Sequence, residues 1–227
     1  MRRKIPIILT VEEIQKIIKI PNEKTRTGLR NKAMLSFIWD SGCRVSDLIN
    51  LRPGNINIGK REVTVLGGKG GVDRNLLFSD YTASLLKKYK DQRPESKYFF
   101  CTEYQTNNPK NRKQKTANKL DRVYIYNTIR NYAKRAGINK RVGPHTFRHS
   151  YALNFYRATH DLITLQKILG HKSLVTTQIY CYIDNTDVKK ASEVYYKKRD
   201  DHYEDPGIAS RIEDLEKQLQ LLKASVK

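Results

Sequence analysis

Four side chains in the third quarter of the chain have the chemistry that a phosphate ester requires. His145 and Arg148 lie three residues apart, so on a helix they share one face. Pro144 suits the first helical position, and near a helix start the free N–H groups and the dipole favour an anion. His171 adds a second imidazole, and Tyr180, nine residues later, carries a hydroxyl that can act as a nucleophile. These residue types and spacings predict a phosphate site with a nucleophile beside it.

Helix ends are expected to position these groups. A helix over Asp161–Leu169 should stop at Gly170, which suits the left-handed C′ position and presents the next histidine from the turn. Ser173 can cap a third short helix that carries Tyr180 and Tyr182. Each histidine alone is more typical of a structural residue at a helix end, so the prediction depends on the joint pattern. We assign no role to the other three histidines, His149, His160 and His202.

A second arginine begins another predicted helix. Arg44 opens the segment CRVSDLINL, which closes at Arg52–Pro53 because proline does not continue a helix. Asp47 follows three residues after Arg44, where its carboxylate is expected to steady the arginine guanidinium. An arginine at a helix start opposes the helix dipole unless an anion joins it. Arg44 is therefore a candidate phosphate ligand, although this observation alone also fits a solvated surface arginine.

The remaining pattern predicts a mainly α fold with a small three-stranded antiparallel β-sheet, an α+β arrangement. Thr10 and Glu13 form a capping-box signature at the start of the first helix. Between Ile56 and Phe78, three short β runs are separated by turn residues. Further helices are predicted over Leu9–Ile20, Leu29–Ser41, Asp80–Lys90, Val123–Ala136 and Asp187–Arg199.

Lys69 lies at the tip of a predicted hairpin turn, in GGKGGVDR. The segment is not a nucleotide-binding loop, because Ser or Thr does not follow the lysine and no helix is predicted after it. A lysine on a turn is usually solvated, but the four surrounding glycines would let Lys69 swing towards a backbone phosphate.

The charge balance indicates an acidic partner. The 227 residues include 44 Lys and Arg against 23 Asp and Glu, a formal net charge of +21. Double-stranded DNA fits this excess best. Residues 201–227 hold six acids against four bases, which leaves 40 bases and 17 acids in residues 1–200. We therefore expect a DNA-processing domain over residues 1–200 and a distinct tail over 201–227.

Three cysteines without CxxC spacing argue against disulfides and structural zinc, and favour a reducing compartment, the cytoplasm. We expect no metal site and no cofactor. No apolar run has the length of a membrane span. Membrane association is therefore not expected.

A basic segment, Thr106–Arg122, precedes the predicted helix Val123–Ala136. It is either a solvated loop or a segment that lies along DNA phosphates, and we favour the second interpretation. The candidate DNA contacts here and in the helix are Lys110, Arg112, Lys113, Lys115, Lys119, Arg122 and Arg130.

The tail carries a short coiled-coil-like pattern of apolar residues spaced alternately by four and three. Two heptads are marginal alone in water, so self-association and packing on the body both remain open. The apolar positions are Ile208, Ile212, Leu215, Leu219 and Leu222.

From about Leu9 to Ile183, the chain resembles the catalytic domain of the tyrosine recombinases, the phage-integrase family that includes the Xer recombinases. The resemblance rests on six ordered positions. These are Arg44 in SGCRVSDLINL, Lys69 in GGKGGVDR, His145 and Arg148 in HTFRHSYA, His171 in LGHKSL and Tyr180 in TTQIY; Asp47 matches the usual acidic companion of the first arginine.

The resemblance implies DNA strand cutting and rejoining through a 3′-phosphotyrosyl intermediate, without metal or ATP. Arg44, Arg148 and His171 would bind the non-bridging phosphate oxygens, and Tyr180 would attack phosphorus. Lys69 would protonate the leaving 5′-oxygen. Because the phenol needs a proton acceptor, His145 is expected to take that role.

Two departures from the family pattern stand out. Family members usually carry a separate DNA-clamping domain before this one, and we expect no such core-binding domain in this chain. Tyr182 replaces the histidine that often follows the nucleophile by two residues, although the spacing from His171 favours Tyr180. A site-specific recombinase or integrase acting as a homotetramer on DNA is the leading interpretation. A monomeric type IB topoisomerase-like enzyme and a DNA-binding regulator that does not cleave are the alternatives.

Overall fold

A computed structural model of the chain describes residues 6–67, 73–103, 117–184, 186–201 and 206–225. Lys69 and most of the basic segment, up to Lys115, therefore lie outside the described residues. The described helices are α1 Val11–Lys19, α2 Arg26–Ser41, α3 Val45–Asn50, α4 Asp80–Gln92, α5 Arg122–Arg135, α6 Pro144–Thr159, α7 Leu162–Leu169, α8 Ile179–Ile183, α9 Thr186–Asp201 and α10 Pro206–Ser225, with 3-10 turns η1 Pro53–Asn55 and η3 Leu174–Thr176. The strands are β1 Ile56–Asn57, β2 Glu62–Val65 and β3 Arg74–Leu77.

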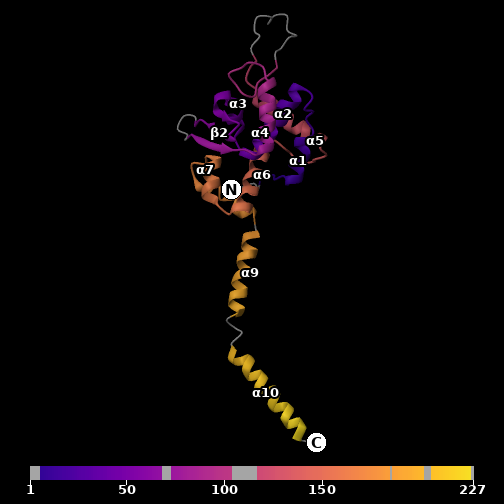
Figure 1. Cartoon of the computed structure of the whole chain (residues 1–227), viewed down its shortest axis with the longest axis vertical. Helices are drawn as coiled ribbons and strands as arrows, with labels where there is room; N and C mark the ends of the chain where they lie inside the picture. Colours follow the sequence, from indigo (N-terminus) through magenta and orange to yellow (C-terminus); the bar gives the residue numbers. More distant parts are fainter. Residues whose placement is uncertain (1–5, 68–72, 104–116, 185, 202–205, 226–227) are drawn as a thin grey trace, which may run out of the picture. The chain divides into compact units, whose positions relative to one another are not determined.

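Helix α2 runs through the centre of the helical body. It lies beside α4 and also packs on α1 and α6 (Figure 1). Most of its residues are buried, including Met34 and Phe37. A helix that is covered on nearly all sides is a core helix, so α2 fixes the positions of the shorter elements around it.

Helix α6 links two apolar cores. Phe147 belongs to the main core, which is built largely from α1 to α5 and the sheet. One turn later, Ala152 and Leu153 belong to a smaller core with α7 and α8, which includes Tyr180. The α6 residues between these two cores are therefore held from both sides, and they include Arg148.

The structure contains the end signals predicted at Thr10–Glu13 and at Gly170, and a further glycine end at Gly42. Thr10 and Glu13 form a capping box, with the Thr10 hydroxyl accepting from the Glu13 N–H at 3.2 Å and the Glu13 carboxylate from the Thr10 N–H at 2.8 Å. Gly42 and Gly170 end α2 and α7 in the left-handed conformation, with φ of 56° and 60°. These caps fix where α3 begins and where His171 is presented.

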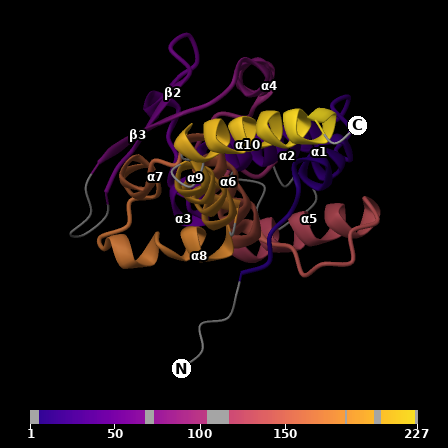
Figure 2. The same cartoon turned by 90° about the horizontal axis from the view of Figure 1, so that it is seen from below.

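The predicted antiparallel sheet is confirmed, in the order β1-β2-β3. Val63 pairs with Ile56 on one side and Leu76 on the other, so the central strand carries the apolar face inward. Helix α7 lies beside β3 (Figure 2), which brings the hairpin next to the turn that carries His171.

The contacts divide the chain into residues 1–183 and 184–227, so α9 groups with α10. The boundary near residue 200 and the coiled coil in the tail stay predictions. The described apolar side chains of α10, such as Ile212, Leu215 and Leu219, are exposed. Among the residues that the structure describes, no helix is long and apolar enough to cross a membrane.

Candidate active site

The start of α6 places the first two candidate residues differently. Pro144 occupies the first helical position after Gly143, as the sequence predicts. His145 is exposed and makes no side-chain hydrogen bond to another described residue. Arg148, one turn further on, is only 6% exposed. The shared helix face therefore carries one side chain open to solvent and one enclosed by the fold.

Arg148 ties three segments together through its guanidinium. It donates to the Gly42 carbonyl at the end of α2 at 2.7 Å and to the Leu169 carbonyl at the end of α7 at 2.6 Å. Its Nη2 also lies 3.2 Å from Nε2 of His171. Burial, followed by the charge of Arg44, lowers the pKa of Arg148 to about 10, so the side chain is still a cation at neutral pH.

Two further arginines, Arg44 and Arg74, lie close to the Gly170 turn. Arg44, the N-cap of α3, donates from Nη2 to the Gly170 carbonyl at 2.7 Å. A β-carbon built on Gly170 would lie 2.6 Å from Nη1 of Arg74 and 3.3 Å from Nη1 of Arg44. The absence of a side chain at Gly170 is therefore what lets two guanidiniums approach this turn.

Asp47 supports this cluster in a different way from the one expected. Its Oδ2 accepts the Arg44 backbone N–H at 3.1 Å and forms an ion pair with Arg74, and no bond to the Arg44 guanidinium is present among the described residues. Arg74 and Asp47 are 12% and 15% exposed, so their pairing is largely shielded from solvent. Sequence reasoning missed Arg74, although it lies in the quoted GGKGGVDR segment.

His171 is fixed by bonds to both ring nitrogens. Since arginine can only donate, Nε2 accepts from Arg148, and Nδ1 lies 2.9 Å from the Thr177 hydroxyl as the donor. Burial first, then the charges of Arg148 and Arg44, lower the pKa of His171 to about 4. The ring is therefore neutral at pH 7 in the free protein.

Tyr180 is buried and its hydroxyl has a histidine partner. Ser173 caps the turn η3, and a separate helix, α8, carries Tyr180 and Tyr182, where the sequence suggests one continuous helix. Tyr180 is 1% exposed, whereas Tyr182 is 76% exposed. The Tyr180 hydroxyl lies 2.9 Å from Nδ1 of His149, a residue to which the sequence pattern assigned no role.

Burial shifts the pKa values of Tyr180 and His149 in opposite directions. Burial raises the pKa of Tyr180 to about 12, although the Arg148 charge acts against the rise. Burial, together with His145 and Arg148, lowers the pKa of His149 to about 4. At neutral pH both groups are uncharged, so a hydrogen bond joins them rather than an ion pair.

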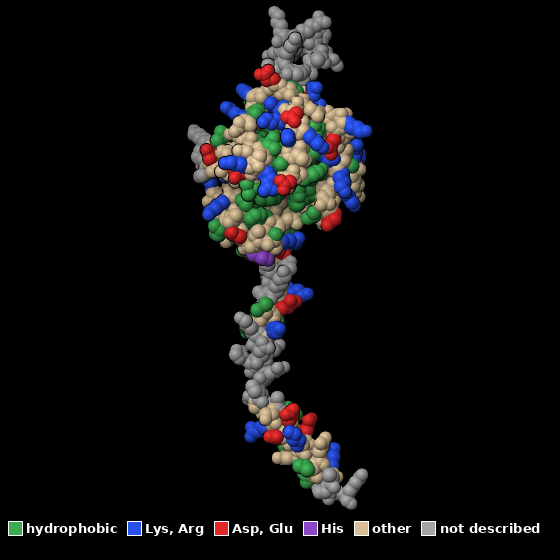
Figure 3. Space-filling view, viewed as in Figure 1, with side chains coloured by type: hydrophobic (Ala, Val, Ile, Leu, Met, Phe, Trp, Pro, Cys, Tyr) green, Lys and Arg blue, Asp and Glu red, His purple; other side chains and the backbone are tan. Residues whose placement is uncertain are grey.

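Three of the proposed DNA-contact residues are described, and all are exposed: Lys119, Arg122 and Arg130. Lys119 also donates to Asn50 at 2.6 Å. The hydroxyl of Tyr124 on α5 bonds to Arg30, so it is not free for DNA. Lys and Arg side chains are spread over the visible face of the body rather than gathered in one cluster (Figure 3).

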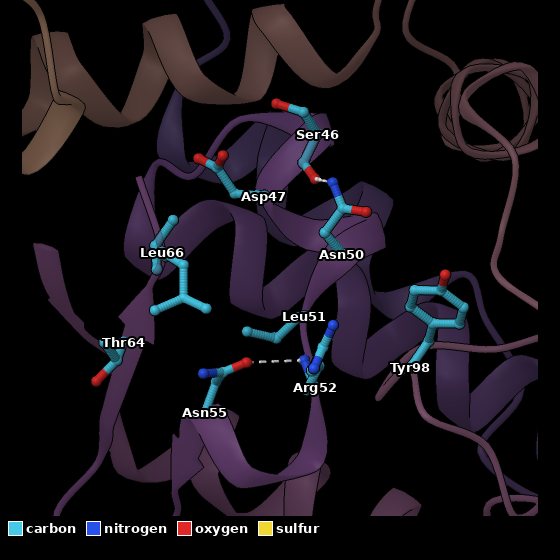
Figure 4. Close-up of a pocket in the computed structure, with 10 residues that line it drawn as sticks. Ser46, Asp47, Asn50, Leu51, Arg52, Asn55, Thr64, Leu66 and Tyr98 are labelled. Carbon is cyan, nitrogen blue, oxygen red and sulfur yellow. Dashed lines mark hydrogen bonds between the residues drawn. The ribbon is translucent and has the colours of Figure 1, made fainter. Parts of the chain in front are cut away.

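A cavity of about 370 Å³ lies between α3, β2 and Tyr98 (Figure 4). Of the proposed catalytic and supporting residues that the structure describes, Asp47 alone is in its lining. Within the described ranges, no three His, Cys, Asp or Glu side chains gather as metal ligands would. The candidate site is the arginine–histidine cluster at the Gly170 turn and the adjacent Tyr180.

Solved structures share this architecture. The XerA recombinase crystal structure has a TM-score of 0.68 at 29% identity, covering 88% of this chain and 66% of that chain. XerH site-specific recombinase, bound to palindromic difH substrate in a post-cleavage complex, has a TM-score of 0.68 at 27% identity, covering 85% and 54%. The catalytic domain of bacteriophage HP1 integrase shares the fold at 18% identity and a TM-score of 0.53, covering 83% and 94%. The fold is that of tyrosine recombinase catalytic domains.

The chain belongs to the phage integrase family, whose sequence profile matches residues 8–186. It is 34% identical over 202 residues to tyrosine recombinase XerD of Chlorobaculum tepidum, covering 87% of this chain and 64% of the relative. It is 33% identical over 190 residues to tyrosine recombinase XerA of Pyrococcus furiosus, covering 83% and 62%. The chain thus spans less than two thirds of the length of these relatives.

Proposed function

We propose that the protein is a site-specific DNA recombinase that cuts and rejoins strands through a 3′-phosphotyrosyl bond at Tyr180. The observation that carries the proposal is the meeting of Arg44, Arg148 and His171 at the Gly170 turn, within bonds of 2.6–3.2 Å. Two guanidiniums at one point are repulsive unless anionic or carbonyl oxygens lie between them, and a phosphodiester supplies such oxygens.

In the proposed reaction, Arg44 and Arg148 bind the non-bridging oxygens and stabilise the charge of the transition state. His171 becomes a third donor once a phosphate anion raises its proton affinity. Lys69, which lies outside the described residues, is assigned to the leaving 5′-oxygen, and His145 to proton transfer in the opening turn of α6. Asp47 holds the Arg44 backbone and Arg74.

The partner is double-stranded DNA, and strand exchange between two sites implies a homotetramer. XerH, a neighbour in structure, is bound to difH substrate, and the formal charge of +21 suits a polyanion. The basic segment with Lys110, Arg112, Lys113 and Lys115 is proposed to lie along DNA phosphates. We place the protein in the cytoplasm, where its free thiols Cys43, Cys101 and Cys181 stay reduced.

The proposal is tested by trapping the covalent intermediate. The protein is incubated in EDTA with a nicked DNA substrate that cannot be religated, and protein–DNA adducts are separated under denaturing conditions. Wild type and Tyr182→Phe are expected to form the adduct. Tyr180→Phe is expected to form none, because it lacks the hydroxyl that is assigned as the nucleophile.

The control and the contrary outcomes are separate. Tyr182 lies two residues after Tyr180 and is exposed. Tyr182→Phe therefore controls for the loss of a phenol hydroxyl on α8. An adduct that persists in Tyr180→Phe would contradict the assignment. The absence of any wild-type adduct would favour a DNA-binding regulator, and supercoil relaxation without strand exchange would favour a topoisomerase-like enzyme.

A further inference from the structure

Among the histidines that the structure describes, His149 is the one whose ring is hydrogen-bonded to the proposed nucleophile. Its Nδ1 lies 2.9 Å from the Tyr180 hydroxyl, and the two rings are tilted at 51° with centroids 6.0 Å apart. Both side chains come from segments that pack in the smaller core. The contact is therefore built into the fold and does not depend on an exposed loop.

The direction of this hydrogen bond follows from burial. The Tyr180 hydroxyl is buried, and among the described residues His149 is the acceptor within reach of its proton. If Nδ1 were the donor instead, the phenol proton would be left buried without a partner, which is costly. The phenol therefore donates to a neutral ring whose proton is on Nε2.

We propose that His149 is the catalytic residue that accepts the Tyr180 proton as the phenol attacks phosphorus. This inference rests on the proposed function and replaces His145 as the first acceptor. The Tyr180 O–H bond breaks as its oxygen bonds to phosphorus, and the P–O5′ bond breaks. The proton passes to Nδ1 of His149, and the 5′-oxygen takes a separate proton from the group assigned to it, Lys69. Rejoining runs through the same transfers in reverse.

The placement of His149 couples proton transfer to phosphate binding. Arg148 and His149 are consecutive on α6, so the groups that bind phosphate and the nucleophile are fixed by one helix turn. The charge of Arg148 contributes to the low proton affinity of His149 in the free protein. A bound phosphate anion offsets this charge, so His149 becomes a better base when substrate is present.

His145 lies where a proton that His149 has accepted can pass on to solvent. It lies four residues before His149, on the same helix face, and it is exposed. The charge of His145 is among the influences on His149. A proton received by His149 can therefore leave towards solvent on the side of His145, whereas the phenol itself is enclosed.

The test compares two substitutions at His149 in single-turnover adduct formation. His149→Asn retains an acceptor atom near the Nδ1 position but cannot take a proton, and His149→Ala removes both properties. We expect both variants to be slower by about 10²-fold or more, because positioned proton acceptors contribute about 10²–10⁴-fold. Added imidazole is expected to accelerate His149→Ala and to leave His149→Asn unchanged.

His160→Asn is the matched control. It makes the same substitution at the C-cap of the same helix, where φ is 52° and asparagine is well tolerated. We expect its rate to equal that of wild type. Thermal unfolding of each variant tests whether the fold is retained. If one of the two His149 variants does not fold, the other is compared with wild type by itself.

The outcomes separate the two proposals. A His149→Asn rate equal to wild type, or a slow His149→Ala that imidazole does not restore, would overturn the role as proton acceptor while leaving recombination intact. A faster His149→Ala would overturn it as well, since His149 would then only restrain Tyr180. If wild type forms no adduct, the proposed function fails and this inference fails with it.

Discussion

At the residue scale, Arg148 is the side chain that joins the parts of the site. Its guanidinium bonds to the ends of α2 and α7 and to the ring of His171. The planar guanidinium holds five N–H donors in a fixed geometry that suits acceptors on several segments, whereas the three donors of a lysine ammonium diverge from one atom on a flexible stem. Burial first, and the Arg148 charge in addition, keep both His171 and His149 neutral.

The two neutral histidines make stability depend on pH. Folding lowers the pKa of both His149 and His171 from an ordinary value of 6.5 to about 4. Between these values the unfolded chain binds more protons, so stability is complete above about pH 6.5 and is lost as the pH falls towards 4. We expect the melting temperature to drop over this range when it is followed by circular dichroism.

Replacement of both histidines by glutamine checks the source of this effect. The double variant His149→Gln/His171→Gln is expected to show a shallower fall in melting temperature between pH 6.5 and 4, whatever its stability at pH 7. A slope equal to that of wild type would assign the acid sensitivity to other groups.

At the element scale, the end of α7 is the part of the fold on which the site geometry depends. Gly170 ends this helix with φ of 60°, and its bare Cα lies under the guanidiniums of Arg74 and Arg44. Gly137, just beyond α5, has φ of 74°, and a β-carbon there would meet no atom within 4 Å. The two glycines thus share a backbone conformation but differ in their surroundings.

Substitution of each glycine by alanine separates these two properties. Gly137→Ala is expected to cost about 1–2 kcal/mol in the free energy of unfolding, because a left-handed conformation is unfavourable for alanine. Gly170→Ala should have this cost and should also displace Arg74 and crowd Arg44, so that adduct formation slows by about 10²-fold or more. Denaturant unfolding and single-turnover cleavage measure the two effects, and equal cleavage rates in both variants would contradict the packing argument.

Local signals in the sequence predicted the elements well. The Thr10–Glu13 capping box and the glycine end of α7 are short-range patterns, and the structure contains both. The separation of η3 from α8 was not predictable, since no proline or glycine marks it.

Contacts between residues far apart in the chain could not be predicted from the sequence. Tyr180 and His149 are 31 residues apart, and His149 was set aside because no nearby residue marks a partner. Arg74 on β3 and Asp47 on α3 are 27 residues apart, and their ion pair joins two elements that are not neighbours in the sequence. A single sequence cannot supply such contacts, because helix and strand periodicity describe neighbours along one element.

At the scale of the whole molecule, the charge is the main property relevant to DNA. The formal net charge is +21, and the two proposed DNA-contact residues on α5, Arg122 and Arg130, are exposed. A body that carries such an excess repels itself, and a polyanion relieves that repulsion. Affinity for DNA is therefore expected to depend on counterion release.

The dependence of DNA affinity on salt concentration measures counterion release. A protein with six to ten phosphate contacts loses about 10³–10⁵ in affinity between 50 and 200 mM salt, and we expect a loss in this range. Fluorescence anisotropy with a labelled duplex gives the slope, and the neutralised variant Arg122→Gln/Arg130→Gln should have a shallower one. A flat response in wild type would contradict a surface that follows the DNA backbone.

The enclosure of Arg148 has a consequence for selectivity among anions. Its N–H groups already donate to two main-chain carbonyls, and 6% of the residue is exposed. We expect inorganic phosphate or sulfate to compete weakly for the proposed site, because a small ion makes too few contacts to open this arrangement. A duplex that spans the surface would supply the additional energy, and the proposed nucleophile would then be kept from acting on small phosphate compounds.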